Sequence, residues 1–458
     1  MNHLSNDNTR GTDSRRKAWR LLLEQETSGA FLKDLFATRL GDFSAEDRDF
    51  IRNMCMGTLR NKRLLDYNLD LHATRGIKDK ALRVLLRLAT YQLLFLSGVP
   101  AFAVVNTTVE IAKGEFHESM AGFSNALLKA ISRTGLKQYP GTDWKALAIN
   151  TSHPDWLVKR WLQTMKPLQL EAALRRNNEE APLWIRSNPR RLSVEGLCDA
   201  LQSEGVELEP CSEVPLYLRI LKGADRALRH EAFASGAFSF QDPIAFWVVY
   251  GLHWRPGLSF LDTCSAPGGK SALLVEMALH RGEDLGQSRL VCCDLSFMRL
   301  RKIFDARERL GHQELMPVCA DLKDLPFQVA NGENGFDCVL VDAPCSNLGV
   351  LRRRPEARWN LTPEKIPALA TRQFELLVQA SKSVAQGGRL VYATCSAERE
   401  ETWNVVSRFL ESEKGKNFKL AEIDPHIPTA LIKKGCLWVY PGETEYDGFF
   451  AATLAKTF

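Results

Sequence analysis

Two cysteines lie just beyond the ends of predicted strands. The apolar run 338–341 predicts a buried strand of a parallel sheet, and it ends at Asp342, three residues before Cys345. A second predicted strand, 389–394, runs directly into Cys395. Because open α/β sheets bind ligands at the carboxyl ends of their strands, we expect both thiols at one functional rim. A thiolate can add to C6 of a pyrimidine, which makes C5 electron-rich enough to attack an electrophilic methyl group.

The position of the two thiols, more than either thiol alone, indicates this chemistry. A buried structural cysteine is common and inert, so each one taken singly is better explained by packing. Both, however, follow the carboxyl end of a strand, and each is followed by serine. Asp342 could steady a bound base through its amino edge and N3, balancing charge that develops on the ring. We therefore favour covalent catalysis on a pyrimidine base.

A glycine turn lies at the same predicted rim. Residues 258–264 predict a strand that runs into the turn 265–270 (SAPGGK), and a helix is predicted from Ser271. Backbone N–H groups in such a turn, with the positive end of the helix, face whatever binds there. A phosphate-binding P-loop would need glycine where Cys264 stands, and the GxGxxG dinucleotide motif is missing. The turn therefore has room for a nucleoside or a small carboxylate.

Two further acids follow the next predicted strands. Asp294 ends the strand predicted at 289–294, where a Rossmann-type sheet places the carboxylate that binds a ribose hydroxyl. Asp321 follows the strand predicted at 316–320 and could hold an adenine amino group. Each acid has a structural alternative, since Asp294 could cap a helix and Asp321 could cap the turn toward Leu325. Together with the glycine turn, the acids favour a nucleoside-shaped site.

The composition is that of a folded protein with reduced thiols. A chain of 458 residues with 45% apolar content is long enough for two or three domains. Its formal charge of +5 has the sign expected for a nucleic-acid partner but is too small to decide the matter. Eleven cysteines without a CxxC pair indicate neither disulfides nor a metal site. Without a signal segment or a membrane span, we expect a cytoplasmic protein with no membrane contact.

Helical periodicity fills the first part of the chain, and strands alternate with helices in the last part. We predict a disordered lead (1–14), an all-α domain (15–134), a linker (135–151), a small α+β RNA-binding module (152–235) and a Rossmann-type α/β domain (236–458). The fold class is therefore multidomain, with a helical bundle joined to a doubly wound parallel sheet.

Two helix ends are predicted from glycine. An apolar stripe over residues 81–96 predicts a helix that stops before Gly98. A second helix is predicted over 371–385, where Gly387 and Gly388 are expected to end it.

A basic run follows the Cys345 loop. Arg352, Arg353 and Arg354 are consecutive, and Trp359 is close behind them. A solvated surface turn would explain such a run without any partner. Because the run flanks the predicted catalytic loop, we favour contact with RNA phosphates.

The motifs FLDTCSAPGGKS, VCCDLS, CADLKD, VLVDAPCSNLGVLRRRPEARW and LVYATCSAEREE resemble, in this order, those of the Sun/NOL1/NOP2 family of RNA cytosine-C5 methyltransferases. The segments GAFSFQDPIA and YPGETEYDGFFAATLAK extend the resemblance. The N-terminal segments RRKAWRLLLE, EDRDFIRNMCMGTLR, ALRVLLRLATYQLLFL, VVNTTVEIAKG and FSNALLKAISR are similar to a NusB-like RNA-binding domain. The pairing of these two domains is similar to that of bacterial small-subunit rRNA enzymes of the family.

This resemblance implies roles that spacing alone does not assign. The cofactor would be S-adenosyl-L-methionine, with its ribose on Asp294, its adenine on Asp321, and its sulfonium beside Asp342. Cys395 would be the nucleophile at C6, and Cys345 would help release the product, although spacing alone could equally favour Cys345 as the nucleophile. The cofactor residues implied in this way are Cys264, Ser265, Ala266, Pro267, Gly268, Gly269, Lys270, Asp294, Asp321 and Asp342.

The chain departs from the family pattern at a few positions. Asn347 and Leu348 replace the small pair usual before Gly349, and Thr402 stands where asparagine is frequent. These differences would affect substrate fit or release rate without touching the nucleophile.

The implied substrate is 16S rRNA, either naked or in an early assembly particle, with cytosine 967 as the expected target and a monomeric enzyme. A cytosine in a helix must leave its stack to reach a thiol, so we expect the target in a loop or another open element. Two alternatives remain at this point, namely methylation of tRNA or another RNA, and a non-catalytic RNA-binding assembly factor.

Overall fold

The computed structural model describes residues 3–286, 288–323, 325 and 335–457, and the chain divides into two compact units. The first unit comprises residues 1–180 together with 351–363, and the second comprises 181–350 together with 364–458. Each unit is described separately below. No helix within the described residues is long and apolar enough to cross a membrane.

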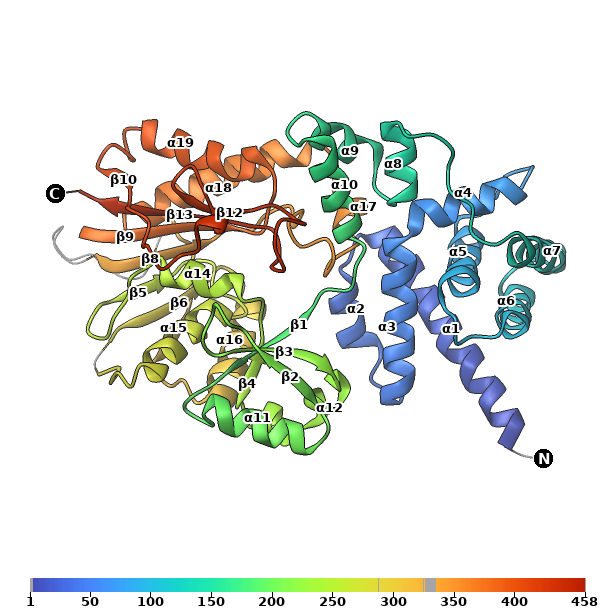
Figure 1. Ribbon diagram of the computed structural model, residues 1–458, viewed down its shortest axis with the longest axis horizontal. Helices are drawn as coiled ribbons and strands as arrows, with labels where there is room; N and C mark the ends of the chain where they lie inside the picture. The colour runs from blue at the N-terminus through green and yellow to red at the C-terminus, as the bar shows by residue number, and fades with distance from the viewer. Residues whose placement is uncertain (1–2, 287, 324, 326–334, 458) are drawn as a thin grey trace. The chain divides into compact units, whose positions relative to one another are not determined.

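The first unit is helical (Figure 1). Its hydrophobic core is formed by apolar stripes from several helices, as in the packing of Leu21, Met54 and Leu85. Polar side chains set the helix starts, since Ser44, Asp79 and Asp143 each accept a hydrogen bond from a backbone N–H three residues later. The helices are α1 His3–Ser28, α2 Leu32–Arg39, α3 Ala45–Arg60, α4 Lys62–His72, α5 Lys80–Phe95, α6 Ala101–Glu115, α7 Glu118–Thr134, α8 Trp144–Asn150, α9 Asp155–Leu162, α10 Pro167–Arg176 and α17 Ala357–Asn360.

Sequence periodicity predicted α5 correctly, but it did not predict the helical structure in residues 3–14 or in the segment 135–151. The helix predicted over 81–96 is confirmed. The prediction of a disordered lead is wrong, because α1 begins at His3 and Ser14 is buried, donating its hydroxyl to Asp47 at 2.9 Å. The predicted linker 135–151 contains α8, so it is not an extended connection.

The segment 351–363 is part of the helical unit although it follows the Cys345 loop in sequence. Arg358 is fully buried and donates to the carbonyl oxygens of Ser152 (3.1 Å) and Asn177 (3.0 Å). The indole Nε1 of Trp359 donates to the carbonyl of Leu59 at 2.9 Å. Buried backbone carbonyls need such donors, so this segment completes the packing of the unit.

The second unit begins with a small antiparallel sheet in the order β2-β3-β1-β4. Helix α11 covers it, with Leu197 and Leu201 packed against Ile185 and Phe238 of the strands. These elements are β1 Leu183–Ser187, α11 Val194–Ser203, β2 Glu207–Pro210, β3 Tyr217–Lys222, α12 Ala224–Arg229, α13 Glu231–Ala234 and β4 Phe238–Phe240.

The larger sheet has the order β11-β12-β13-β9-β8-β5-β6-β7, with β10 paired to β13. The five strands β9, β8, β5, β6 and β7 are parallel, and β13 joins β9 antiparallel. This confirms the Rossmann-type prediction. The strands are β5 Phe260–Asp262, β6 Leu290–Asp294, β7 Leu315–Cys319, β8 Phe336–Asp342, β9 Val384–Thr394, β10 Phe418–Leu420, β11 Ile432–Lys433, β12 Cys436–Val439 and β13 Phe449–Lys456.

Helices cover both faces of this sheet (Figure 1). Because side chains alternate along a strand, Leu340 of β8 packs into the core shared with α14 and α15, whereas Val339 and Val341 pack into the core shared with α18 and α19. The helical elements are α14 Ile244–Tyr250, α15 Gly269–His280, α16 Phe297–Leu310, α18 Lys365–Ser381, the short turn η2 Arg399–Glu401, α19 Trp403–Glu411 and the short turn η3 Thr429–Leu431.

The predicted stop at Gly387 and Gly388 is wrong in one respect. Helix α18 ends at Ser381, and both glycines lie within β9. Gly387 has a φ of 73°, a conformation that glycine adopts without strain, and it lies where the pairing of β9 with β8 shifts between Val384 and Arg389.

Candidate active site

The two predicted thiols meet at the carboxyl edge of the larger sheet. Strands β8 and β9 are parallel neighbours, with Asp342 paired to Ala393, so the loops that follow them leave the sheet side by side. The Sγ atoms of Cys345 and Cys395 are 2.9 Å apart, and both side chains are half-buried. The structure thus brings together the two residues that the sequence placed at separate strand ends.

The two thiols differ in their surroundings. The hydrogen bond with Cys395 and burial together raise the pKa of the Cys345 thiol well above its ordinary value. Cys345 therefore keeps its proton at neutral pH. The Sγ of Cys395 also lies 3.3 Å from Oδ1 of Asn347, a residue with a φ of 61°, which asparagine tolerates better than most residues. Asn347 was noticed in the sequence only as a departure from the family pattern.

Backbone contacts hold the two cysteine loops against each other. The N–H of Gly349 donates to the carbonyl of Cys395 at 3.0 Å, and the N–H of Gly448 donates to the carbonyl of Gly349 at 2.9 Å. A Cβ on Gly349 would lie 2.2 Å from the carbonyl oxygen of Gly448. Glycine is therefore required at position 349 by the close approach of a neighbouring backbone.

Asp342 forms an ion pair with the cofactor turn. Nζ of Lys270 lies 2.5 Å from Oδ2 of Asp342 and 5.3 Å from the ring centroid of Phe449. Burial alone would lower the pKa of Lys270, but the charge of Asp342 and the hydrogen bond to it raise that pKa above its ordinary value. Lys270 is therefore a fixed positive charge beside the thiols, and not only a backbone element of the turn.

The glycine turn surrounds a buried acid that sequence reasoning did not single out. Asp262 ends β5, is 1% exposed, and accepts a hydrogen bond from the Ser271 hydroxyl at 2.7 Å. Burial raises the pKa of Asp262 to about 6, and the nearby charge of Asp342 adds to the shift. Oδ1 of Asp262 is buried without a protein hydrogen-bond partner among the described residues. An acid three residues before the SAPGGK turn was the available signal.

These groups fit an amino-acid nucleoside such as S-adenosyl-L-methionine. The unpartnered Asp262 oxygen can accept a hydrogen bond from an amino group, and the first N–H groups of α15 can meet a carboxylate. Gly268, with a φ of 93°, opens α15 in a conformation suited to glycine. Cys264 is half-buried, and burial raises the pKa of its thiol to about 12, so it is a neutral group and not a third reactive thiol.

The two predicted nucleoside acids have different environments. Asp294 is 2% exposed and accepts from the N–H groups of Ala266 (3.2 Å) and Ser296 (3.0 Å), and Arg299 lies 3.3 Å from it. It does not cap α16, because the N-cap there is Ser296. Asp321 is exposed and accepts from the N–H of Lys323 at 3.0 Å, which is the local turn contact given as its structural alternative.

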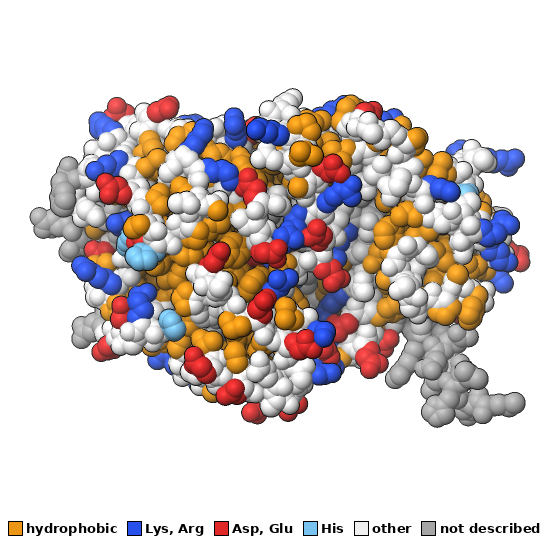
Figure 2. Space-filling model, viewed as in Figure 1, with side chains coloured by type: hydrophobic (Ala, Val, Ile, Leu, Met, Phe, Trp, Pro, Cys, Tyr) orange, Lys and Arg blue, Asp and Glu red, His pale blue; other side chains and the backbone are white. Residues whose placement is uncertain are grey.

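The three arginines predicted to contact RNA phosphates differ in their exposure. Arg352 is 3% exposed and its backbone carbonyl accepts from the Arg60 guanidinium at 3.1 Å, so its side chain offers little accessible surface to an RNA phosphate. Arg353 is half-buried, and Arg354 is exposed with its guanidinium 5.4 Å from the ring centroid of Phe31. Figure 2 shows Lys and Arg side chains interspersed with Asp and Glu on the face drawn.

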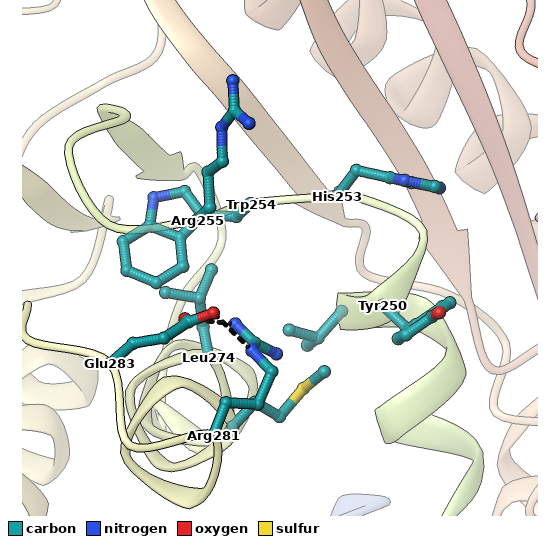
Figure 3. A pocket seen from close by; sticks show the side chains of 9 residues that line it. Tyr250, His253, Trp254, Arg255, Leu274, Arg281 and Glu283 are labelled. Carbon is teal, nitrogen blue, oxygen red and sulfur yellow. Dashed lines mark hydrogen bonds and ion pairs between the residues drawn. The ribbon is translucent and has the colours of Figure 1, made fainter.

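A separate cavity of about 280 Å³ lies at the far end of α15. Figure 3 shows Arg281 and Glu283 facing each other there, with an ion pair of 2.8 Å. Its walls come from the end of α14, from residues 253–255, and from the later part of α15 and the residues after it, whereas Lys270 and the glycine turn lie at the start of α15. This cavity is therefore distinct from the thiol site. It is lined by Val249, Tyr250, His253, Trp254, Arg255, Leu274, Met277, Arg281 and Glu283.

A parallel sheet with an antiparallel β13 and a glycine turn before α15 are the features of a Rossmann-type methyltransferase, here with two adjacent thiols at the rim of the sheet. Comparisons with known proteins identify the family. The family described as 16S rRNA methyltransferase RsmB/F matches residues 249–455. The NusB family matches residues 12–133, and the RsmF/B-like ferredoxin-like domain matches residues 153–226.

Relatives match over almost the whole chain. A probable ribosomal RNA small subunit methyltransferase B from Bacillus subtilis is 31% identical over 94% of this chain and 95% of its own length. A ribosomal RNA small subunit methyltransferase B from Salmonella paratyphi B is 32% identical over 90% of this chain and 91% of its own length. The crystal structure of PH0851 has a TM-score of 0.77 at 26% identity, covering 96% of this chain and 98% of that chain. The chain belongs to the RsmB family of 16S rRNA methyltransferases, with an N-terminal NusB domain.

The raised pKa of Asp262 predicts a specific pH dependence of stability. Its folded-state pKa of about 6 exceeds the ordinary 3.8, so the folded state keeps this proton to higher pH than the unfolded state. The contribution of Asp262 to the free energy of unfolding is therefore fully present below about pH 4, and it is lost as the pH rises through about 6. The measurement compares the free energy of unfolding of wild type with that of Asp262→Asn in urea titrations. The difference, wild type minus variant, should fall by about 3 kcal/mol between pH 4 and pH 7.

The Ser271 hydroxyl offers a check on this prediction. It stabilises the ionised form of Asp262, so in a Ser271→Ala background the fall should be larger. A difference between wild type and Asp262→Asn that stays constant or rises over this pH range would contradict the assigned direction.

Proposed function

We propose that this chain transfers a methyl group from S-adenosyl-L-methionine to C5 of a specific cytosine in 16S rRNA, through a covalent bond between Cys395 and C6. The observation that carries this proposal is the pair of thiols 2.9 Å apart beside the Lys270–Asp342 ion pair. The family of the chain supports the rRNA substrate. Cytosine 967 is the proposed position, in an open element of the RNA where the base can leave its stack.

The different surroundings of the two thiols support Cys395 as the nucleophile. Cys345 has the raised pKa and keeps its proton, which it can donate in a hydrogen bond to the sulfur of Cys395. A donor at that distance stabilises negative charge on Cys395, because hydrogen bonds to an ionised acceptor are stronger than neutral ones. The Cys395 thiolate then adds to C6, and the electron pair of the C5–C6 double bond moves toward N3 and the ring carbonyl.

We propose that Asp342 steadies the base during that step. Its carboxylate, held by Lys270, can accept from the exocyclic amino group of cytosine while the Lys270 ammonium limits the build-up of negative charge. When bound, S-adenosyl-L-methionine would supply the electrophilic methyl group for C5. We propose that Asp262 and the start of α15 hold its methionine part, that Asp294 holds its ribose and that Asp321 holds its adenine.

Product release needs removal of the C5 proton and departure of the Cys395 sulfur. Once Cys395 is bonded to C6, it no longer holds a hydrogen bond with Cys345, which is the largest cause of the raised Cys345 pKa. Cys345 then becomes easier to ionise. After its own proton has passed to solvent, its thiolate can accept the C5 proton as the Cys395–C6 bond breaks and the ring double bond re-forms.

Substrate and reaction are tested together by incubating the purified chain with labelled S-adenosyl-L-methionine and unmethylated 16S rRNA, with tRNA alongside, and mapping new 5-methylcytosine. A single labelled cytosine in 16S rRNA is expected. Label in tRNA alone would overturn the substrate, and no label in either RNA would favour a non-catalytic assembly factor.

Cys395→Ala should abolish methyl transfer, by at least about 10³-fold, because it removes the thiol proposed to add to C6. Cofactor affinity should stay within about twofold of wild type, measured by calorimetric titration, since the thiol is not part of the glycine turn. Cys198→Ala, in α11, is the matched control and should retain full activity. Retained transfer in Cys395→Ala would end the assignment of the nucleophile.

Cys345→Ala should methylate RNA once and then accumulate a covalent protein–RNA adduct, because addition to C6 is intact but the proton acceptor for release is gone. The adduct should appear as a slower band in denaturing gels with labelled RNA and should be absent from the Cys395→Ala, Cys345→Ala double variant. If Cys345→Ala turns over without adduct, Cys345 has no part in release.

A further inference from the structure

One buried acid connects the two cysteine loops. Glu401 is fully buried, and its Oε1 accepts from the backbone N–H of Ser346 at 2.9 Å. Its Oε2 accepts from the hydroxyl of Ser396. Ser346 and Ser396 directly follow Cys345 and Cys395, and their hydroxyl oxygens are 3.1 Å apart. A single carboxylate therefore holds both loops one residue beyond the thiols.

Other buried contacts fix Glu401 itself. Nε2 of Gln373 donates to Oε1 of Glu401 at 3.0 Å and to the carbonyl of Pro344, the residue before Cys345, at 2.9 Å. The hydroxyl of Tyr392 donates to the backbone carbonyl of Glu401 at 2.7 Å. Tyr392 lies in β9 and Gln373 in α18, so rigid elements set the position of the carboxylate.

A carboxylate suits this position better than an amide would. An ionised carboxylate is an acceptor at both oxygens, which matches a backbone N–H, an amide N–H and a hydroxyl arriving together. Glutamine has one acceptor oxygen and an NH₂ group, so the Ser396 hydroxyl, which donates to Oε2, would have to rotate and accept from the amide. Hydrogen bonds to an ionised acceptor are also stronger than neutral ones, which favours a fixed geometry.

We propose that Glu401 is a positioning residue that holds Cys345 and Cys395 at the separation needed for addition to C6 and subsequent release. The proposal rests on the proposed function, because it concerns the two thiols of that mechanism. Glu401 touches neither thiol and acts through the two serines. A displacement of reacting groups by about 1 Å can reduce a catalysed rate about 100-fold, so loss of this link should be visible in kcat.

The test uses Glu401→Gln, with Glu411→Gln as the matched control, since Glu411 is exposed at the end of α19. The first readout is the rate at which Cys345 and Cys395 form a disulfide with diamide, without RNA or cofactor. The azo compound takes both thiol hydrogens and is reduced to a hydrazine, and mass spectrometry of the linked peptides follows the reaction. The second readout is methyl transfer, with kcat and KM determined separately.

Glu401→Gln should form the disulfide about tenfold more slowly than wild type, and kcat should fall about 10- to 100-fold with both KM values within about twofold. Glu411→Gln should match wild type in both readouts. Disulfide formation at the wild-type rate in Glu401→Gln would overturn the proposal, whatever the methyl-transfer rate. A purely structural role would lower the melting temperature without changing the disulfide rate of the folded variant.

Ser396→Ala provides a milder perturbation if Glu401→Gln fails to fold. It removes only the hydroxyl that reaches Oε2, and it should slow both disulfide formation and kcat by a few-fold; unchanged values would overturn the proposal. The oxidation comparison needs no substrate. If wild type methylates no RNA, the proposed function fails, while the disulfide rates still decide the role of Glu401.

Discussion

The site depends on the parallel pairing of β8 with β9. Their register places Asp342 opposite Ala393, so the chain leaves both strands at the same level of the sheet and the two following loops start as neighbours. No feature of either loop alone could bring Cys345 to 2.9 Å from Cys395. The other contacts of the rim refine this arrangement. The glycine contact between residues 349 and 448 brings in the loop before β13, and the link through Glu401 joins both loops to α18 and β9.

The second constraint is charge in a buried setting. Asp262 and Asp342 are two acids at the ends of adjacent strands, and burial makes two ionised carboxylates costly so close together. Lys270 offsets this cost by forming an ion pair with Asp342, and burial together with the charge of Asp342 raises the pKa of Asp262. The Lys270 ammonium thus balances the charge of the Asp342 carboxylate, whereas burial makes Asp262 harder to ionise beside the glycine turn. Environment, and not residue type, separates their roles.

Local sequence patterns were sufficient for most of the second unit. Short apolar runs ending in an acid predicted β6 and β8 within a residue or two, because buried parallel strands have a strong local signature. Contacts that depend on distant segments were not predictable in this way. In the sequence, Glu401 is one of several acids in the motif SAEREE. Only the structure shows that its carboxylate accepts a hydrogen bond from the backbone N–H of Ser346, 55 residues earlier. Asp262 was passed over for the same reason, since its burial and its missing partner arise from the fold.

The environment of the basic run after the Cys345 loop could not be predicted from neighbouring residues. Three consecutive arginines suggest a solvated surface, yet Arg352 and Arg358 are buried and the segment 351–363 belongs to the helical unit. Arg358 is stabilised by carbonyls that lie about 180 to 206 residues away in sequence, which no spacing rule could have indicated. Because Val350 and Leu351 are consecutive, the loop that carries Cys345 ends where a segment anchored in the helical unit begins. The segment 351–363 belongs to the helical unit, yet it directly follows the loop that carries Cys345 in the chain. Removal of residues 1–180 by truncation would therefore leave this segment without the helices that it packs against.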